Sequence, residues 1–110
     1  MMNDVINLIV VTKTPDTDGF EQETETPMEC FAEIRSVRSA EFYQAAHEGI
    51  TVKVVAVINV DDYDAAAVVD VVTGKKIKPS LVEYDGQKYR IARDYKTSKR
   101  KVELTLQEVE

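Results

Sequence analysis

The sequence has little of the chemistry that catalytic sites need. In 110 residues it has one histidine, His47, one cysteine, Cys30, and no tryptophan. A Ser/His/Asp or Cys/His arrangement would have to use His47, and no motif surrounds it. We expect His47 near the end of a short helix, where a cation is stabilised by the helix dipole. We therefore expect a protein that is not an enzyme and binds no cofactor.

A single cysteine excludes an internal disulfide and a CxxC site. It is consistent with a reducing compartment, and we interpret Cys30 as a small buried hydrophobic residue. No GxxxxGK or GxGxxG stretch is present to hold a phosphate group. Asp61, Asp62 and Asp64 are followed by three alanines, where a calcium-binding loop needs further oxygen ligands and a glycine. We expect no metal site.

Long apolar runs are also missing. Residues 1–4 have no basic side chain, and the apolar stretch 8–11 is too short for a signal peptide. No segment approaches the roughly 20 apolar residues of a membrane span. The length fits one domain over residues 1–110, and 44% hydrophobic residues suffice for a core. These features predict a soluble intracellular protein.

Positive charge is in the minority, because 14 Lys and Arg face 20 Asp and Glu, for a net charge of -6. Proteins that bind nucleic acid on their own usually carry the opposite sign, since cations supply their affinity. The densest basic group is at the start of the last predicted strand. It provides the candidate phosphate contacts, although a solvated turn is the simpler interpretation: Lys96, Lys99, Arg100 and Lys101.

What the sequence does contain is a series of alternating β patterns. They predict strands at 5–13, 28–37, 50–60 and 102–109 and a hairpin at 81–91. Asp85-Gly86 is typical of a type I′ turn, which places Val82 opposite Tyr89. Residues 50–60 carry alternating apolar side chains, with Val55 and Val57 between them, so the middle of that strand should be covered on both faces.

The other segments are read as connections. Residues 14–27 indicate an acidic loop, and 40–48 a short helix capped by Ser39 and ended by Gly49. Residues 61–80 indicate a turn and an extended loop with a possible minor hairpin at Gly74-Lys75; 65–73 could be a strand or a short helix. The fold class is therefore all-β, a small antiparallel barrel or sandwich of five to six strands with one short helix between strands 2 and 3.

Three motifs together resemble the head-tail joining, or head-completion, proteins of tailed bacteriophages. Residues 31–45, FAEIRSVRSAEFYQA, match a strand with A-x-I followed by a helix beginning E-F-x-x-A. Residues 84–91, YDGQKYRI, are similar to the family's Y-x-G-x-x-Y-x-I hairpin, and 102–109 to its last strand. Residues 61–80 depart from the family, because this connection is longer than usual.

The resemblance implies a small barrel decorated by loops and a helix, which forms a ring in the virion neck. Such a ring binds copies of itself, the portal-adaptor ring and tail proteins, closes the DNA-filled head and docks the tail. The subunit would be in the host cytoplasm during assembly. Glu41, Phe42 and Tyr43 then become a candidate docking helix.

A connector needs adaptable loops and no reactive centre. An acidic channel would repel DNA phosphates and let packaged DNA slide during transient contact. The alternatives are a tail terminator or tail-completion protein, and an OB-like nucleic-acid-binding module. The candidate channel-facing or partner-binding residues are in two stretches: Asp16, Asp18, Glu21, Glu23 and Glu25, or Asp61, Asp62, Asp64 and Asp70.

Overall fold

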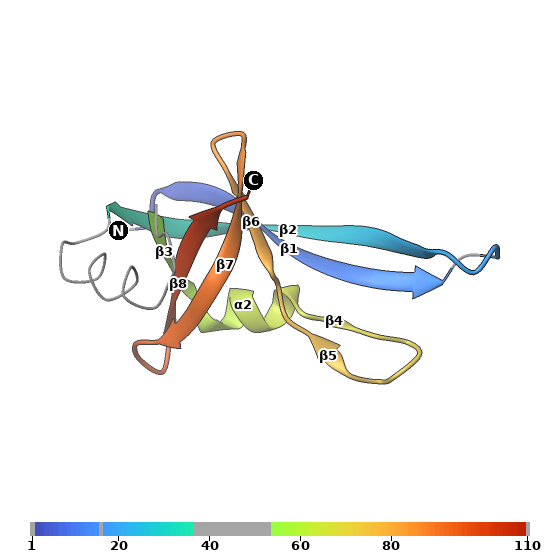
Figure 1. Ribbon diagram of the computed structural model, residues 1–110. Helices are drawn as coiled ribbons and strands as arrows, with labels where there is room; N and C mark the ends of the chain where they lie inside the picture. The colour runs from blue at the N-terminus through green and yellow to red at the C-terminus, as the bar shows by residue number, and fades with distance from the viewer. Residues whose placement is uncertain (1, 16, 37–53, 110) are drawn as a thin grey trace.

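A computed structural model describes residues 2–15, 17–36 and 54–109 of the chain. Most of these residues are in β-strands, and the described elements follow one another as shown in Figure 1. They are β1 (Asp4–Pro15), β2 (Glu21–Ser36), β3 (Val54–Asn59), α2 (Val60–Ala66), β4 (Val68–Val69), β5 (Lys76–Ile77), β6 (Leu81–Tyr84), β7 (Gln87–Lys96) and β8 (Lys101–Glu108).

Six of the strands form a closed antiparallel barrel in the order β1-β2-β3-β8-β7-β6. Two three-stranded meanders, β1 to β3 and β6 to β8, are joined by the β3–β8 and β1–β6 pairs. Closure leaves no open edge on the barrel itself, which protects its strands from pairing with other chains. The expected all-β antiparallel fold is confirmed, and of the two expected architectures, barrel or sandwich, it is the barrel.

The core follows the alternation seen in the sequence. The inward positions of β1 and β8, among them Ile6, Leu8, Leu104 and Leu106, are at most 1% exposed. Large aliphatic side chains at every second position supply most of the hydrophobic free energy of such a barrel. In β3 both faces are covered, as expected, because Val55 and Val57 are buried together with their inward neighbours.

Helix α2 lies across one end of the barrel and contacts β1, β2, β3 and β8. Its buried residues, Tyr63 and Ala66, are three positions apart and so share one face. This corrects the turn expected at 61–64: the helix lies between β3 and β4. The helix expected at 40–48, with His47, lies outside the described residues.

Two hairpins form where the sequence indicates turns. Asp85 and Gly86 have φ values of 52° and 77°, as a type I′ turn requires, and Val82 pairs with Tyr89. The minor hairpin is also confirmed, since β4 pairs with β5 and Gly74 has a φ of 72°. The turn at 97–100 between β7 and β8 is present as well.

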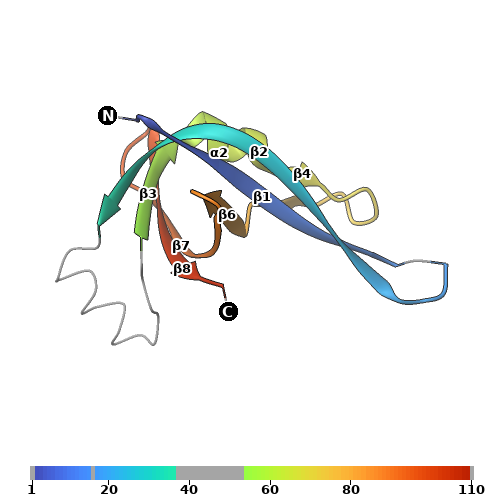
Figure 2. The same cartoon turned by 90° about the horizontal axis from the view of Figure 1, so that it is seen from above.

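The acidic loop expected at 14–27 is wrong. β1 continues to Pro15 and β2 begins at Glu21, with pairs such as Thr12 opposite Thr24. Past Ile9, β1 pairs only with β2 in the described part of the chain, so this end of the hairpin projects from the barrel (Figures 1 and 2). We call residues 10–15 and 21–26 the distal ribbon.

Candidate functional site

The distal ribbon carries its acidic side chains on one face. Glu21, Glu23 and Glu25 are exposed and occupy alternate positions of β2. Successive side chains on one face of a strand are about 6.6 Å apart, so the three carboxylates form a row. Lys13 is the direct cross-strand neighbour of Glu23. Asp18 belongs to the turn at the tip, and Asp16 lies outside the described residues.

An ion pair fixes the base of this row to the barrel. Lys88 Nζ, at the start of β7, donates to Glu25 Oε1 at 2.7 Å and to Oε2 at 3.0 Å. The hydrogen bond to Glu25 raises the pKa of the Lys88 ammonium group. Both side chains are more than 40% exposed, so water screens the pair and its contribution to stability is small. Its main effect is to orient the ribbon.

The β4–β5 hairpin also projects from the barrel, and its tip is apolar. Val71 and Val72 are 94% and 79% exposed, and Val69 is exposed beside them. Asp70 organises the turn, because its carboxylate accepts a 2.8 Å hydrogen bond from the Val72 amide. Its own amide donates to the Lys75 carbonyl. The candidate residue Asp70 therefore has a structural role in displaying these valines.

The four basic candidates are brought together at the β7–β8 turn. Ser98 Oγ accepts hydrogen bonds from the amides of Arg100 and Lys101, both at 3.2 Å, and so closes the turn. The Val60 amide at the start of α2 donates to the Arg100 carbonyl, which ties the turn to the helix. Lys101 Nζ is directed back to Asn59 Oδ1 at 3.0 Å, whereas Lys96 and Lys99 are exposed.

The three remaining acidic candidates share helix α2. Asp61 and Asp62 are in its first turn, where the helix dipole favours negative charge. Asp61 and Asp64 are exposed. The predicted acidic set is thus divided between the ribbon, the helix and the β4–β5 turn. The candidate docking residues Glu41, Phe42 and Tyr43 lie outside the described residues.

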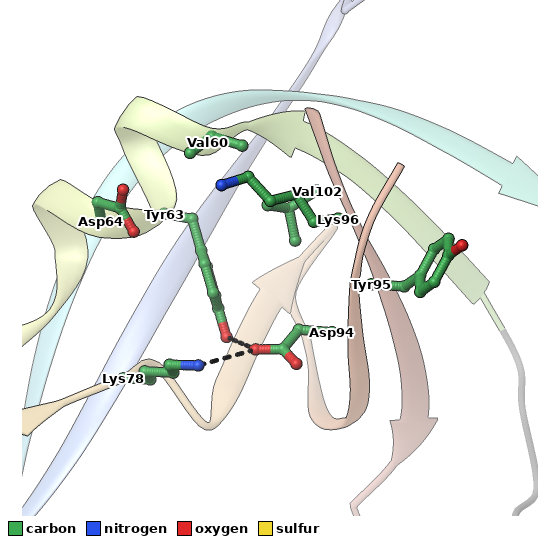
Figure 3. A pocket seen from close by; sticks show the side chains of 8 residues that line it. All are labelled: Val60, Tyr63, Asp64, Lys78, Asp94, Tyr95, Lys96 and Val102. Carbon is green, nitrogen blue, oxygen red and sulfur yellow. Dashed lines mark hydrogen bonds and ion pairs between the residues drawn. The ribbon is translucent and has the colours of Figure 1, made fainter. Parts of the chain in front are cut away.

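A pocket of about 280 Å³ lies between α2 and the β7–β8 hairpin (Figure 3). Tyr63 extends from the helix and its hydroxyl donates a 2.7 Å hydrogen bond to Asp94 Oδ2, and Lys78 Nζ is 3.7 Å from the same oxygen. Burial, with the Asp94 hydrogen bond and charge, raises the pKa of the Tyr63 hydroxyl. Tyr63 therefore stays neutral at physiological pH and is poorly suited to act as a base or nucleophile.

This pocket was not predicted from the sequence, because a β-bulge brings one of its lining residues, Asp94, into place. The β7–β8 register shifts between Ile91 and Arg93, so the side-chain alternation of β7 changes there. Asp94 is brought opposite the inward residue Leu104 and faces α2, while Tyr95 becomes 68% exposed. Strict alternation from Ile91 would have placed Tyr95 inward.

Other reactive groups are inert or separate. Cys30 is buried and confirmed as a core residue, and burial raises the pKa of its thiol to about 12, with smaller contributions from Asp62 and Glu29. Within the described ranges, no three His, Cys, Asp or Glu side chains are grouped to hold a metal ion. No helix of the described residues is long and apolar enough to cross a membrane.

Comparison of the sequence with models of known protein families, and with curated proteins, finds no match in either case.

Proposed function

We propose that the chain is a structural subunit of a phage or prophage neck, where it forms a ring between the portal-adaptor ring and the tail. The observation that carries this proposal is the β4–β5 tip. Val71 and Val72 are 94% and 79% exposed, yet the hydrogen bonds that Asp70 accepts and donates hold the turn that presents them. Adjacent apolar side chains on an ordered projection are typical of surfaces that another protein covers.

The rest of the molecule supports a role in assembly. A closed barrel provides a stiff scaffold, and two hairpins project from it toward one side (Figures 1 and 2). The resemblance of residues 31–45, 84–91 and 102–109 to head-tail joining proteins specifies the assembly. A small barrel with a hairpin at 84–91 is also the fold that this resemblance implies.

Helix α2 offers a surface for the DNA channel. It presents Asp61 and Asp64 to solvent at one end of the barrel. A ring of such carboxylates would repel DNA phosphates and keep packaged DNA from binding to the wall. In this proposal DNA contact is transient, and the basic turn at 97–100 faces protein.

An OB-like nucleic-acid-binding module is the less favoured alternative. OB-folds are five-stranded, partly open barrels that bind through strands 2 and 3 and the loop between strands 1 and 2. Here the barrel has six strands and is closed, and the corresponding hairpin carries Glu21, Glu23 and Glu25. A row of carboxylates there opposes phosphate binding.

The test is inactivation of the gene in the phage or prophage that encodes it. Because the proposed ring closes the filled head, we expect tailless heads that have lost their DNA, next to free tails of normal length, in electron micrographs of the lysate. Wild-type protein supplied from a plasmid during assembly should restore infectious particles. Overlong tails would favour the tail-terminator alternative, and normal virions lacking this protein would refute a neck role.

A further inference from the structure

Among the described residues, the distal ribbon pairs with no third strand. An isolated two-stranded ribbon is marginally stable in water. In the described part of the chain, β1 after Ile9 pairs only with β2, and β2 before Glu33 pairs only with β1, which leaves backbone groups on the outer edges unpaired. Phe20, next to the tip, is 72% exposed. Such a projection is best explained as half of an interface.

The ribbon and the β7–β8 turn have complementary charge. Residues 13–25 carry five carboxylates and one lysine, whereas residues 93–101 carry five cations and one aspartate. Within the described residues, the exposed side chains at the centres of the two surfaces form no ion pair: Glu21 and Glu23 on the ribbon, and Lys96, Lys99 and Arg100 on the turn.

The two surfaces also lie on opposite sides of the barrel. The ribbon projects to the right in Figure 1, and the β7–β8 turn is at the lower left; Figure 2 separates them in the same way. A subunit whose matching surfaces point away from each other cannot satisfy them within one chain. It can satisfy them by joining copies head to tail.

We propose that the distal ribbon of one copy docks on the β7–β8 turn of a second copy. Self-pairing of two ribbons is disfavoured because their acidic faces would repel each other. A head-to-tail contact closes into a ring when its rotation allows. The inference deepens the proposed neck function by naming the contact between subunits, and it leaves the acidic residues of α2 for the channel.

A charge-swap experiment tests the contact. The ribbon variant carries Glu21→Lys and Glu23→Lys, and the turn variant carries Lys99→Glu and Arg100→Glu. Each variant alone then has like charges at the centres of the two surfaces, whereas a mixture brings the reversed centre of the ribbon to the reversed centre of the turn and the native ribbon to the native turn. Self-association is measured by sedimentation up to about 1 mM protein, where weak contacts become visible.

We expect the wild-type protein to self-associate, and we expect this association to weaken when salt is raised from about 50 to 500 mM. Each variant alone should lose affinity by at least about tenfold, and the equimolar mixture should recover it. Glu29→Lys and Lys76→Glu, exposed charges outside both surfaces, serve as matched controls and should associate like wild type. Circular dichroism and thermal unfolding verify that all variants are folded.

The contact is refuted if the wild type stays monomeric throughout this range, if the variants associate normally, or if mixing restores nothing. The neck function is judged separately by gene inactivation. If gene inactivation gives tailless particles but mixing the charge-swap variants does not restore association, only the proposed ribbon contact is refuted. If mixing restores association but gene inactivation leaves virions normal, the contact is supported and the neck function is refuted.

Discussion

The Tyr63 hydroxyl and the Asp94 carboxylate, 31 residues apart, are joined by a 2.7 Å hydrogen bond that ties α2 to β7. Tyr63 is buried among the core residues. Asp94 belongs to the second half of β7, where residues 93–96 are exposed. The bond exists because the bulge after Ile91 turns Asp94 toward the helix. One irregularity in a strand therefore determines how the barrel end is closed.

Removal of this hydrogen bond should weaken the protein measurably. Tyr63→Phe keeps the ring and deletes the hydroxyl, and a hydrogen bond to a charged group contributes about 1.5–3 kcal/mol. Because Asp94 is partly solvated and can bond water instead, we expect a loss of about 1–2 kcal/mol in the free energy of unfolding. Urea denaturation measures it. Tyr95→Phe, at an exposed site, is the control and should change stability by less than about 0.5 kcal/mol.

The barrel could be predicted from sequence because alternation and turn chemistry are local. Val102, Leu104 and Leu106 point inward as their spacing requires, and Asp85-Gly86 forms its turn without help from distant residues. The number of strands and their antiparallel pairing follow from the same signals.

The features that sequence analysis did not predict have a common physical cause, because each depends on partners that are distant in the sequence. The distal ribbon is held by backbone pairing of Thr12 with Thr24 and by Lys88, and neither signal is an apolar pattern. Helix α2 resembles a turn because three aspartates surround Tyr63, and burial against the barrel decides its conformation. Asp94 was not recognised because a bulge cannot be read from alternation.

Alkaline pH should destabilise the fold through Cys30. Burial raises the pKa of this thiol from its ordinary value of 9.0 to about 12, so the native state keeps the thiol protonated where the unfolded chain ionises. The free energy of unfolding is therefore unaffected by Cys30 ionisation below pH 9, and it falls as pH rises from 9 toward 12. Thermal unfolding should show a steeper fall over this range for wild type than for Cys30→Ala. Equal slopes would contradict this assignment.

The β6–β7 turn should require its glycine for backbone reasons alone. Gly86 has a φ of 77°, and a Cβ added there would meet no atom within 4 Å. Gly86→Ala should therefore cost about 1–2 kcal/mol of unfolding free energy, the strain of a left-handed alanine. Asp85→Asn is the control, since asparagine tolerates positive φ, and it should be neutral. Chemical denaturation of both variants distinguishes strain from any general sensitivity of the turn.

The exposed valines should matter for assembly and hardly at all for folding. Val71→Ser with Val72→Ser changes side chains that contact mainly water, so the free energy of unfolding should shift by less than about 0.5 kcal/mol. Leu104→Ala, at a fully buried site, should cost about 2–5 kcal/mol. If the β4–β5 tip docks on another neck protein, the valine variant will be folded yet fail to restore infectious particles when it replaces the wild-type protein in that plasmid complementation. Full restoration by that variant would show that the tip has no role in docking, because the substitutions would then change neither stability nor assembly.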